Sequence, residues 1–434
     1  MDDTDSPRGG CTTYVLTELI ALAHERGLDL LGEPRLVRLN PNIPWRTRGN
    51  AALSARFGHG AGTRRRFGHI DGRPVWSYRR GRHPTREEKL AFLGAAWDRV
   101  QAAAEGGGPG TDPALVAVDQ RLPADLYWTA VREVVAVAVV QARLDRTAAW
   151  YRWSGTPQGL VGAAAAVAWP GRHATWELIA YRERRRWGTP RTVDPSSVQE
   201  VQRRFPRLFL CFDRRTRRLL VAPHTPCPIL FGLRSTDAAS PRRALPRVRS
   251  EPVDRWVTFR TNQGTGDHLT RRSGAEWPDL TSGVVRGRVL APPTIGPGGH
   301  VRFELTVGSG PSLSCVAFEP TKTLPAVARA LCPGDDVRVW GSRSETTAVH
   351  LEGIEVLRWD PYQSRGAAPP CPSCRRRTES AGSGRGFRCR NCRRRLPPEA
   401  AVRVRRTPPL PLGVYHPTPS ARRHLAPRGP DFLE

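Results

Sequence analysis

The chain has 434 residues, of which 39% are hydrophobic and 25% charged, so it has the length for several domains and the composition of a folded protein. Its longest apolar runs, 134–140 and 160–169, are too short to span a bilayer, and its start carries no signal peptide, so we expect a cytoplasmic protein without a membrane partner. With 68 Lys+Arg against 40 Asp+Glu, the formal net charge of +28 favours a nucleic acid as partner over a merely basic surface.

The first residues, MDDTDSPRGGCTTY, hold the densest acidic cluster of this basic chain. Three carboxylates, those of Asp2, Asp3 and Asp5, fall within one short stretch. Carboxylates this close repel one another unless a cation lies between them, and Mg²⁺ with substrate phosphates is the usual solution in proteins. The loop therefore predicts a Mg²⁺ and phosphate site, and the alternative is a solvated acidic turn.

The acidic cluster leads through a glycine pair into a helix that the apolar spacing predicts over 13–26. Gly9 and Gly10 would leave backbone N–H groups open to phosphate oxygens at the start of this helix. Thr12 and Thr13 stand at the same helix start. The alternative for Thr12 is that it serves only as the helix N-cap.

A Gly-rich break at 105–113 separates two regions of mixed helix and strand. Before it, a strand with turns is expected over 35–53 and a helix over 84–104, which gives a first domain at 1–112. The second domain, 113–240, alternates helices and strands as an α+β domain does. Its helices are expected at 124–145 and 158–169, and its strands at 175–182, 207–213 and 218–222.

A polar, Pro-punctuated linker is expected at 236–252, followed by a β region at 253–362. That region has a lead-in, 253–269, and then about five short strands separated by turns. The phrases GVVRGRV and PGDDVRVWGS indicate a small antiparallel barrel that binds nucleic acid, the OB-fold, although many five-stranded β domains would satisfy the pattern. After residue 396 the chain is rich in Pro and Arg, which is typical of a disordered basic tail.

Two cysteine pairs near the C-terminus carry the strongest metal signal in the sequence. CPSC supplies Cys371 and Cys374, and after fourteen residues CRNC supplies Cys389 and Cys392. Each pair aims two thiolates at one point, and two pairs complete a tetrahedron of soft ligands for Zn²⁺. Four protein ligands leave no open position, so this zinc is structural rather than catalytic.

Together these segments resemble one known family. The chain contains, in this order, DDTDSPRGGCTTY, RLVRLNPNIPWRTRGNAA, PHTPCPILFGLRS, FRTNQGTGDHL, the barrel, the cysteine pairs and GVYHPTPSARRHL. In this order they resemble the archaeal tRNA 2-agmatinylcytidine synthetases (TiaS), and the resemblance spans nearly the whole chain. It implies a multidomain α+β architecture with a kinase-like α/β domain at 1–112, a ferredoxin-like domain at 113–240, an OB-fold with its lead-in at 253–362, a zinc ribbon at 368–397 and a docked tail at 398–434.

The resemblance also implies a reaction. An ATP-dependent ligase would join agmatine to C2 of the wobble cytidine of an isoleucine tRNA with a CAU anticodon, which then reads AUA. Because the C2 oxygen is a poor leaving group for an amine, the base must first be activated by phosphoryl transfer. ATP, Mg²⁺ and a structural Zn²⁺ are then the expected cofactors, and tRNA and agmatine the partners. The rival hypothesis is a non-catalytic RNA-binding protein with a vestigial N-terminal ATP site.

Roles for single residues follow from the same resemblance. Thr12 stands where the family has its phosphate-accepting threonine, and the three aspartates would hold Mg²⁺ against ATP. The whole ATP and Mg²⁺ site would comprise Asp2, Asp3, Asp5, Gly9, Gly10 and Thr13. Agmatine is a dication whose pocket needs carboxylates, and on chemistry alone Glu177 and Asp213 are candidates.

The chain departs from the family at its start. Family members usually carry a short apolar strand ending in Gly-Ile before the aspartates, whereas here only Met1 precedes them. Either the start codon lies further upstream, or the chain lacks the strand that would hold the acidic loop rigid. In the second case weak or absent ATP chemistry is expected.

Overall fold

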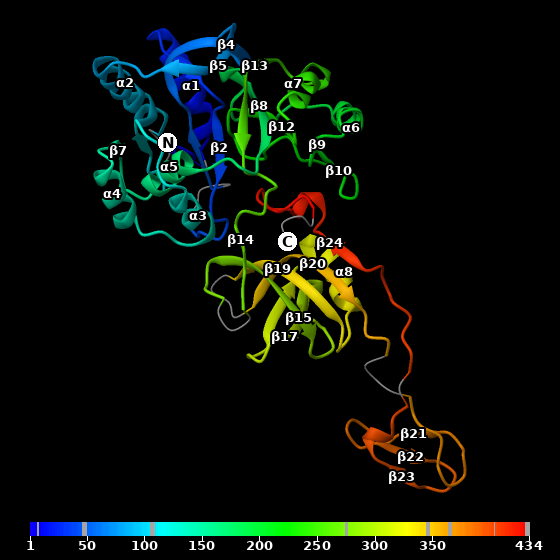
Figure 1. Ribbon diagram of the computed structural model, residues 1–434. Helices are drawn as coiled ribbons and strands as arrows, with labels where there is room; N and C mark the ends of the chain where they lie inside the picture. The colour runs from blue at the N-terminus through cyan, green and yellow to red at the C-terminus, as the bar shows by residue number, and fades with distance from the viewer. Residues whose placement is uncertain are drawn as a thin grey trace. The chain divides into compact units, whose positions relative to one another are not determined.

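The computed structural model describes residues 1–6, 8–45, 50–104, 108, 110–273, 277–343, 348–362, 367–402 and 404–429. The chain folds into two compact units, which are drawn in Figure 1. The first comprises Met1–Thr270, Leu280–Ser282 and Thr418–Glu434, and the second Arg271–Asp279 and Gly283–Pro417. Within the described ranges, none of the helices has the length and apolar character needed to cross a membrane.

A mixed sheet forms the centre of the first unit. Its strands follow the order β1-β5-β4-β13-β8-β12-β9, and β2 pairs with β13 and with β3. The strands are β1 (Asp29–Leu31), β2 (Arg35–Arg38), β3 (Ala51–Ser54), β4 (Phe57–Ile70), β5 (Arg73–Arg82), β8 (Thr175–Arg182), β9 (Leu208–Phe209), β12 (Ile229–Ser235) and β13 (Val253–Thr261). The segment expected as the lead-in to the barrel therefore contains the central strand β13, which pairs with β4, β8 and β2.

Helices cover both faces of this sheet. Successive strand residues point to opposite faces, so each strand contributes side chains to two cores. Ile179 and Tyr181 of β8 enter the core under α1 (Thr12–Glu25) and α2 (Arg86–Ala104), which lie side by side (Figure 1). Leu178 and Ala180 enter the opposite core, under α6 (Pro195–Arg204) and α7 (Ser240–Ala244). The predicted helices at 13–26 and 84–104 are thus confirmed within one or two residues.

A third core lies beneath β2 and β3. Val37 and Ala52 pack there with helices and strands that follow the Gly-rich break, so the core continues across the expected boundary at 112–113. These elements are β6 (Ala114–Ala117), α3 (Ala124–Arg132), α4 (Val137–Arg146), β7 (Trp150–Trp153) and α5 (Gly159–Ala168). The prediction of a single helix at 124–145 was wrong. The backbone is extended at Glu133, which ends α3, and α4 begins four residues later.

Two further expectations need correction. The segment 236–252 is not a linker, because α7 and the short helix η2 (Leu245–Arg247) fold there and bury Ala244 and Val248 against β8 and β12. The single strand expected at 207–213 is broken, because Leu210 has a φ of 53° between β9 and β10 (Phe212–Asp213). The remaining short elements of this unit are η1 (Arg184–Arg186), β11 (Arg218–Leu219) and η6 (Pro419–Ala421).

The second unit contains a small closed barrel, as the sequence predicts. Its ring order is β15-β17-β18-β20-β19, and β15 closes the ring by pairing with both β17 and β19. The ring strands are β15 (Thr281–Val289), β17 (Val301–Thr306), β18 (Leu313–Ala317), β19 (Asp336–Arg343) and β20 (Val349–Arg358). Around the ring lie β14 (Leu269–Arg271), β16 (Thr294–Ile295), η3 (Pro297–Gly299), η4 (Glu319–Thr321), α8 (Thr323–Ala330) and β24 (Gly413–Tyr415).

The end of the chain is folded wherever the structure describes it. The cysteine-rich segment forms a small sheet from β21 (Thr378–Ser380), β22 (Phe387–Cys389) and β23 (Arg395–Leu396), and the short helix η5 (Pro398–Ala400) follows it. β24 then pairs with β20, and the N–H groups of Gly264 and Gly266 donate to His424 O and Leu425 O at 2.8 and 2.9 Å. The docked tail is confirmed, and the disorder expected from composition was wrong for 404–429.

Candidate active site and metal centre

Backbone hydrogen bonds on both sides fix the beginning of the acidic loop. Met1 N donates to Leu53 O of β3 and Leu53 N to Met1 O, both at 2.9 Å. Asp2 N donates to Ala114 O of β6 at 3.0 Å, and Ala114 N donates back to Asp2 O at 3.1 Å. Residues 1 and 2 therefore lie as extended backbone between β3 and β6, which holds the aspartates that follow in a defined place.

The loop opens onto a hollow that gathers the predicted catalytic residues. Asp2, Asp3, Asp5 and Thr12 all line it. The first turn of α5 also lines it, beside Asp2, and so do several apolar side chains. The residues from α5 are Gly159, Val161 and Gly162, with its N-cap Gln158, and the other large apolar side chains are Leu39, Ile43, Trp45 and Val135. The starts of α1 and α5 thus meet at one hollow, and helix N-termini suit phosphate oxygens.

Asp5 holds Thr12 at the start of α1. The N-cap of α1 is Cys11, which makes no side-chain capping bond. Asp5 Oδ1 instead accepts hydrogen bonds from Thr12 N at 2.7 Å and from Thr12 Oγ1 at 3.1 Å. The alternative interpretation of Thr12 as the N-cap is therefore wrong, because Asp5 caps the helix and also orients the threonine hydroxyl.

The aspartates are close enough to disturb one another. Burial, followed by the neighbouring charges of Asp2 and Asp112, raises the pKa of Asp3 to about 8. Burial likewise raises the pKa of Asp2 to about 6. Burial is the largest cause of both shifts, and neighbouring carboxylates add to it. Asp112 was missed by the sequence analysis, because it lies in the Gly-rich break, far from the loop along the chain.

The two glycines of the loop serve its backbone geometry. A Cβ at Gly10 would lie 2.5 Å from Thr4 O, and Gly9 has a φ of +126° with its Cβ position 2.8 Å from Pro226 O. Their N–H groups donate inside the loop, from Gly9 N to Ser6 O and from Gly10 N to Ser6 Oγ. Gly9 and Gly10 therefore allow the loop to close on itself, and their N–H groups already have partners there.

Other residues of the predicted ATP site lie elsewhere. Thr13 is buried, and its Oγ1 lies 3.1 Å from Cys11 Sγ, away from the residues that line the hollow. Gly159 and Gly162 of α5 do line it, and a Cβ at Gly162 would lie 1.8 Å from Asp2 Oδ2. The only sequence signal that α5 lines the hollow is the spacing of these two glycines in an otherwise Ala-rich helix.

Glu177, a candidate for agmatine, already has a cationic partner. It is buried on β8, where its Oε1 accepts from Arg234 Nε at 3.2 Å and its Oε2 from Gln263 Nε2. Gln263 Oε1 in turn lies 3.1 Å from His424 Nδ1 in the C-terminal tail. The charge of Glu177 is therefore compensated by Arg234, and its carboxylate helps to fix the tail.

Asp213, the second candidate, keeps its charge. Its Oδ1 accepts from the N–H groups of Arg215 and Thr216, and its Oδ2 from Ser420 N at 3.1 Å. Burial alone would raise its pKa, but the hydrogen bonds from Ser420 and Thr216 outweigh burial and lower the pKa to about 2. Asp213 forms no ion pair with a cationic side chain in the described part of the chain.

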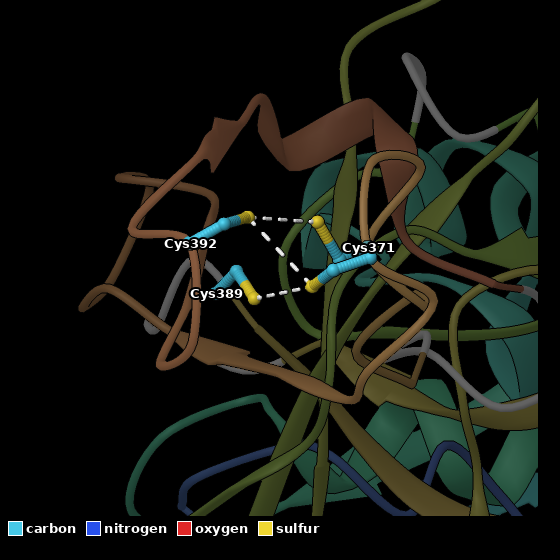
Figure 2. A group of neighbouring side chains, drawn as sticks. Cys371, Cys389 and Cys392 are labelled. Carbon is cyan, nitrogen blue, oxygen red and sulfur yellow. Dashed lines mark hydrogen bonds between the residues drawn. The ribbon is translucent and has the colours of Figure 1, made fainter.

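The cysteine cluster fits a zinc ion. The four sulfur atoms of Cys371, Cys374, Cys389 and Cys392 lie within 4.8 Å of one another, and Figure 2 shows those of the labelled residues converging. Sγ–Sγ distances of 3.4, 3.5 and 3.7 Å match the roughly 3.8 Å edge of a tetrahedron with Zn–S bonds of about 2.3 Å. A hydrogen bond from the Arg376 backbone helps to lower the pKa of Cys374 to about 6, whereas the contact with Cys371 helps to raise that of Cys392 to about 11.

Comparison with known proteins decides the family. Family models match at residues 1–153 (TiaS TCKD domain), 157–268 (TiaS FLD domain) and 368–407 (TiaS C-terminal zinc ribbon domain). The isoleucine tRNA 2-agmatinylcytidine synthetase TiaS of Methanopyrus kandleri is 34% identical over 449 aligned residues, which cover 100% of this chain and 96% of that protein. The TiaS of Archaeoglobus fulgidus is 35% identical over 431, with 98% and 95% covered. This chain belongs to the TiaS family.

Solved TiaS structures agree with this assignment. A complex of TiaS with its isoleucine tRNA and ATP aligns with a TM-score of 0.79 and 33% identity, covering 98% of this chain and 94% of that one. A complex of TiaS with the same kind of tRNA, AMPCPP and agmatine aligns with a TM-score of 0.76 and 30% identity over the same shares. The TiaS zinc ribbon match at 368–407 contains all four cysteines of the cluster.

Proposed function

We propose that this chain is an ATP-dependent ligase that joins agmatine to C2 of the wobble cytidine in an isoleucine tRNA. The observation that carries the proposal is the hollow at the starts of α1 and α5. The three aspartates line it, and so does Thr12, whose hydroxyl donates a hydrogen bond to Asp5. A vestigial site would have no need to keep this arrangement, which argues against a purely RNA-binding protein. Because the substrate is tRNA, we place the reaction in the cytoplasm.

Mg²⁺ belongs to this proposal as the partner of ATP. Asp2, Asp3 and Asp5 would hold it, since all three carboxylates line the same hollow. The bound ion would neutralise phosphate charge during phosphoryl transfer. The start of α5 lies beside the Asp2 carboxylate at the same hollow, and helix N-termini suit phosphate oxygens. Gly9 and Gly10 support the site through the shape of the loop, and Thr13 through its contact with Cys11.

Thr12 is the proposed phosphate acceptor of the chain. A hydroxyl that attacks phosphorus must lose its proton, so a base has to lie within hydrogen-bond reach. Asp5 Oδ1, 3.1 Å from Thr12 Oγ1, is in place to take that proton. The tRNA base needs activation for its own reason: agmatine's amine can displace the C2 oxygen only after that oxygen has become a phosphate ester, which then leaves as phosphate.

The sheet topology supports the finer domain names. The segment β8-α6-β9-β12-α7-β13 has the βαββαβ order and the strand sequence β13-β8-β12-β9 of a ferredoxin-like domain, and this extends it to Thr261. In the barrel, β18 and β20 run parallel, and α8 joins β18 to β19. This arrangement supports the OB-fold. The hollow is lined from both sides of the expected boundary at 112–113, by the acidic loop and by the start of α5.

Glu177 and Asp213 remain the proposed carboxylates for agmatine, and Asp213 is favoured because its charge has no cationic partner in the described residues. We expect Asp213→Asn to raise the KM for agmatine about 10- to 100-fold, the usual cost of one charged hydrogen bond, and Glu177→Gln to raise it less. Initial rates at saturating ATP and tRNA measure this. Unchanged KM values in both variants would remove both residues from the agmatine site.

The proposed function is tested by incorporation of labelled agmatine. We expect wild-type protein, incubated with ATP, Mg²⁺ and total tRNA of the source organism, to label an isoleucine tRNA, and to label none when ATP is left out. Digestion of the product to nucleosides identifies the modified base. Tight tRNA binding without any label would instead favour the RNA-binding alternative.

A further inference from the structure

The β4–β5 hairpin carries a row of arginines outside the hollow. β4 has 14 residues and β5 has 10, well beyond the roughly 5 or 6 that are usual for a strand. Arg64, Arg65 and Arg66 follow one another in β4 and are all exposed. The register of the hairpin shifts on either side of them, between Ala61 and Arg64 and again between Arg66 and Gly68. Such irregularities re-aim side chains, here at the two ends of the arginine run.

Each of the three guanidinium groups lies over an aromatic ring. The Cζ atom of Arg64 is 4.5 Å from the ring centre of Trp76, that of Arg65 is 5.6 Å from Phe67, and that of Arg66 is 5.4 Å from Trp256. Stacking of this kind restricts a long side chain before any ligand arrives, so less entropy is lost on binding. The row is thus held in place although it is exposed.

Within the described residues, the positive charge of this row has no acidic partner. None of the three arginines forms an ion pair with a carboxylate in the described ranges, and the same holds for the other exposed arginines of the hairpin, Arg73, Arg79, Arg80 and Arg82. Arg242 of α7 adds to the charge, since its Nη1 donates to Arg66 O at 2.6 Å. The pKa of Arg242 is lowered by partial burial and then by Arg65 and Arg66. The nearby carboxylate of Asp237 accepts hydrogen bonds from the start of α7.

We propose that Arg64, Arg65, Arg66 and Arg242 form a binding surface for the phosphate backbone of the tRNA. This rests on the proposed function, which makes tRNA the substrate. Stacked guanidinium groups recognise phosphates in a bidentate manner, and alternate residues of a strand lie about 7 Å apart, so Arg64 and Arg66 can meet separate phosphates. No large apolar side chain among those exposed in the described residues lies on this hairpin, so it has nothing to insert into a lipid surface.

The test compares two charge-matched triple variants. We expect Arg64→Ala/Arg65→Ala/Arg66→Ala to weaken binding of an isoleucine tRNA transcript at least about 10-fold at about 0.15 M salt, and to lower the slope of log K against log salt by about 2 to 3. The control, Arg26→Ala/Arg86→Ala/Arg146→Ala, removes three exposed arginines elsewhere. It should change the tRNA affinity and the salt slope by no more than about a third of the changes expected for the Arg64–Arg66 variant. Replacement of the row by three lysines should keep the salt slope and lose only part of the affinity.

The outcomes separate this surface from the proposed function. If the alanine variant keeps the wild-type tRNA affinity and salt slope, the proposed tRNA-binding surface is wrong, even if the wild-type protein ligates agmatine. An equal loss in the control variant also overturns it, since total charge would then explain the effect. The proposal is also wrong if the alanine variant loses binding to phosphatidylglycerol vesicles and keeps its affinity for tRNA. If the wild-type protein incorporates no agmatine and the alanine variant loses affinity for tRNA, the proposed function is wrong and the tRNA-binding surface is supported.

Discussion

Thr12→Ala is expected to abolish incorporation of labelled agmatine into tRNA, with a loss of at least about 10³-fold, and to leave the affinity for tRNA within about twofold of the wild type. The substitution removes the hydroxyl that lies 3.1 Å from Asp5 Oδ1 and keeps the backbone hydrogen bond from Thr12 N to the same oxygen. The start of α1 is therefore preserved. The loss would reflect chemistry rather than folding.

Two measurements check the Thr12 prediction. Label from γ-labelled ATP should appear on the wild-type chain and be absent from the Thr12→Ala variant. Thr12→Ser, which keeps a hydroxyl at the same position, should retain both activities within about 10-fold. An alanine variant that modifies tRNA at the wild-type rate would exclude Thr12 as the phosphate acceptor.

Gly162→Ala is expected to lower the ATP-dependent activity about 100-fold or more without unfolding the protein. Its new methyl group would lie 1.8 Å from Asp2 Oδ2 and 3.1 Å from a methyl group of Leu39, so the Asp2 carboxylate must turn away from the hollow. In a helix interior, Ala normally stabilises relative to Gly by about 1 kcal/mol, which offsets part of this strain. Thermal unfolding should therefore change little while agmatine incorporation falls.

Gly94→Ala is the matched control for Gly162→Ala. Gly94 lies in the interior of α2, is exposed, and has no atom within 4 Å of its Cβ position. We expect this variant to be as active as the wild type and slightly more stable. If Gly162→Ala were equally active, the position of the Asp2 carboxylate could not matter for the reaction.

Local sequence patterns predicted much of the site. The acidic loop, the helix that follows it and the threonine at its start occupy adjacent positions, so their proximity needs no tertiary contact. The zinc cluster is similar, because each CxxC pair sets two ligands through one tight turn. The family resemblance then supplied the reaction and the role of Thr12, which no spacing could provide.

Strand order, in contrast, could not be obtained from local patterns. The segment of β13 was expected only as a lead-in to the β region. Its place at the centre of the first sheet depends on pairing with β2, β4 and β8, which are far away in sequence. The expected linker at 236–252 failed for a related reason. Its short helix α7 has few apolar residues and becomes stable only through burial of Ala244 against the sheet.

The sequence by itself determined which chemical groups this protein has: an acidic loop, a tetrathiolate zinc site and a large excess of arginine. The tertiary structure alone decided what those groups face. It brought the start of α5 and Asp112 to the loop, gave Glu177 an arginine partner, left Asp213 without one among the described residues, and placed the Arg64–Arg66 row over aromatic rings. The physical reason is that periodicity and spacing encode local geometry, whereas contacts between distant segments depend on how several elements bury their apolar faces together.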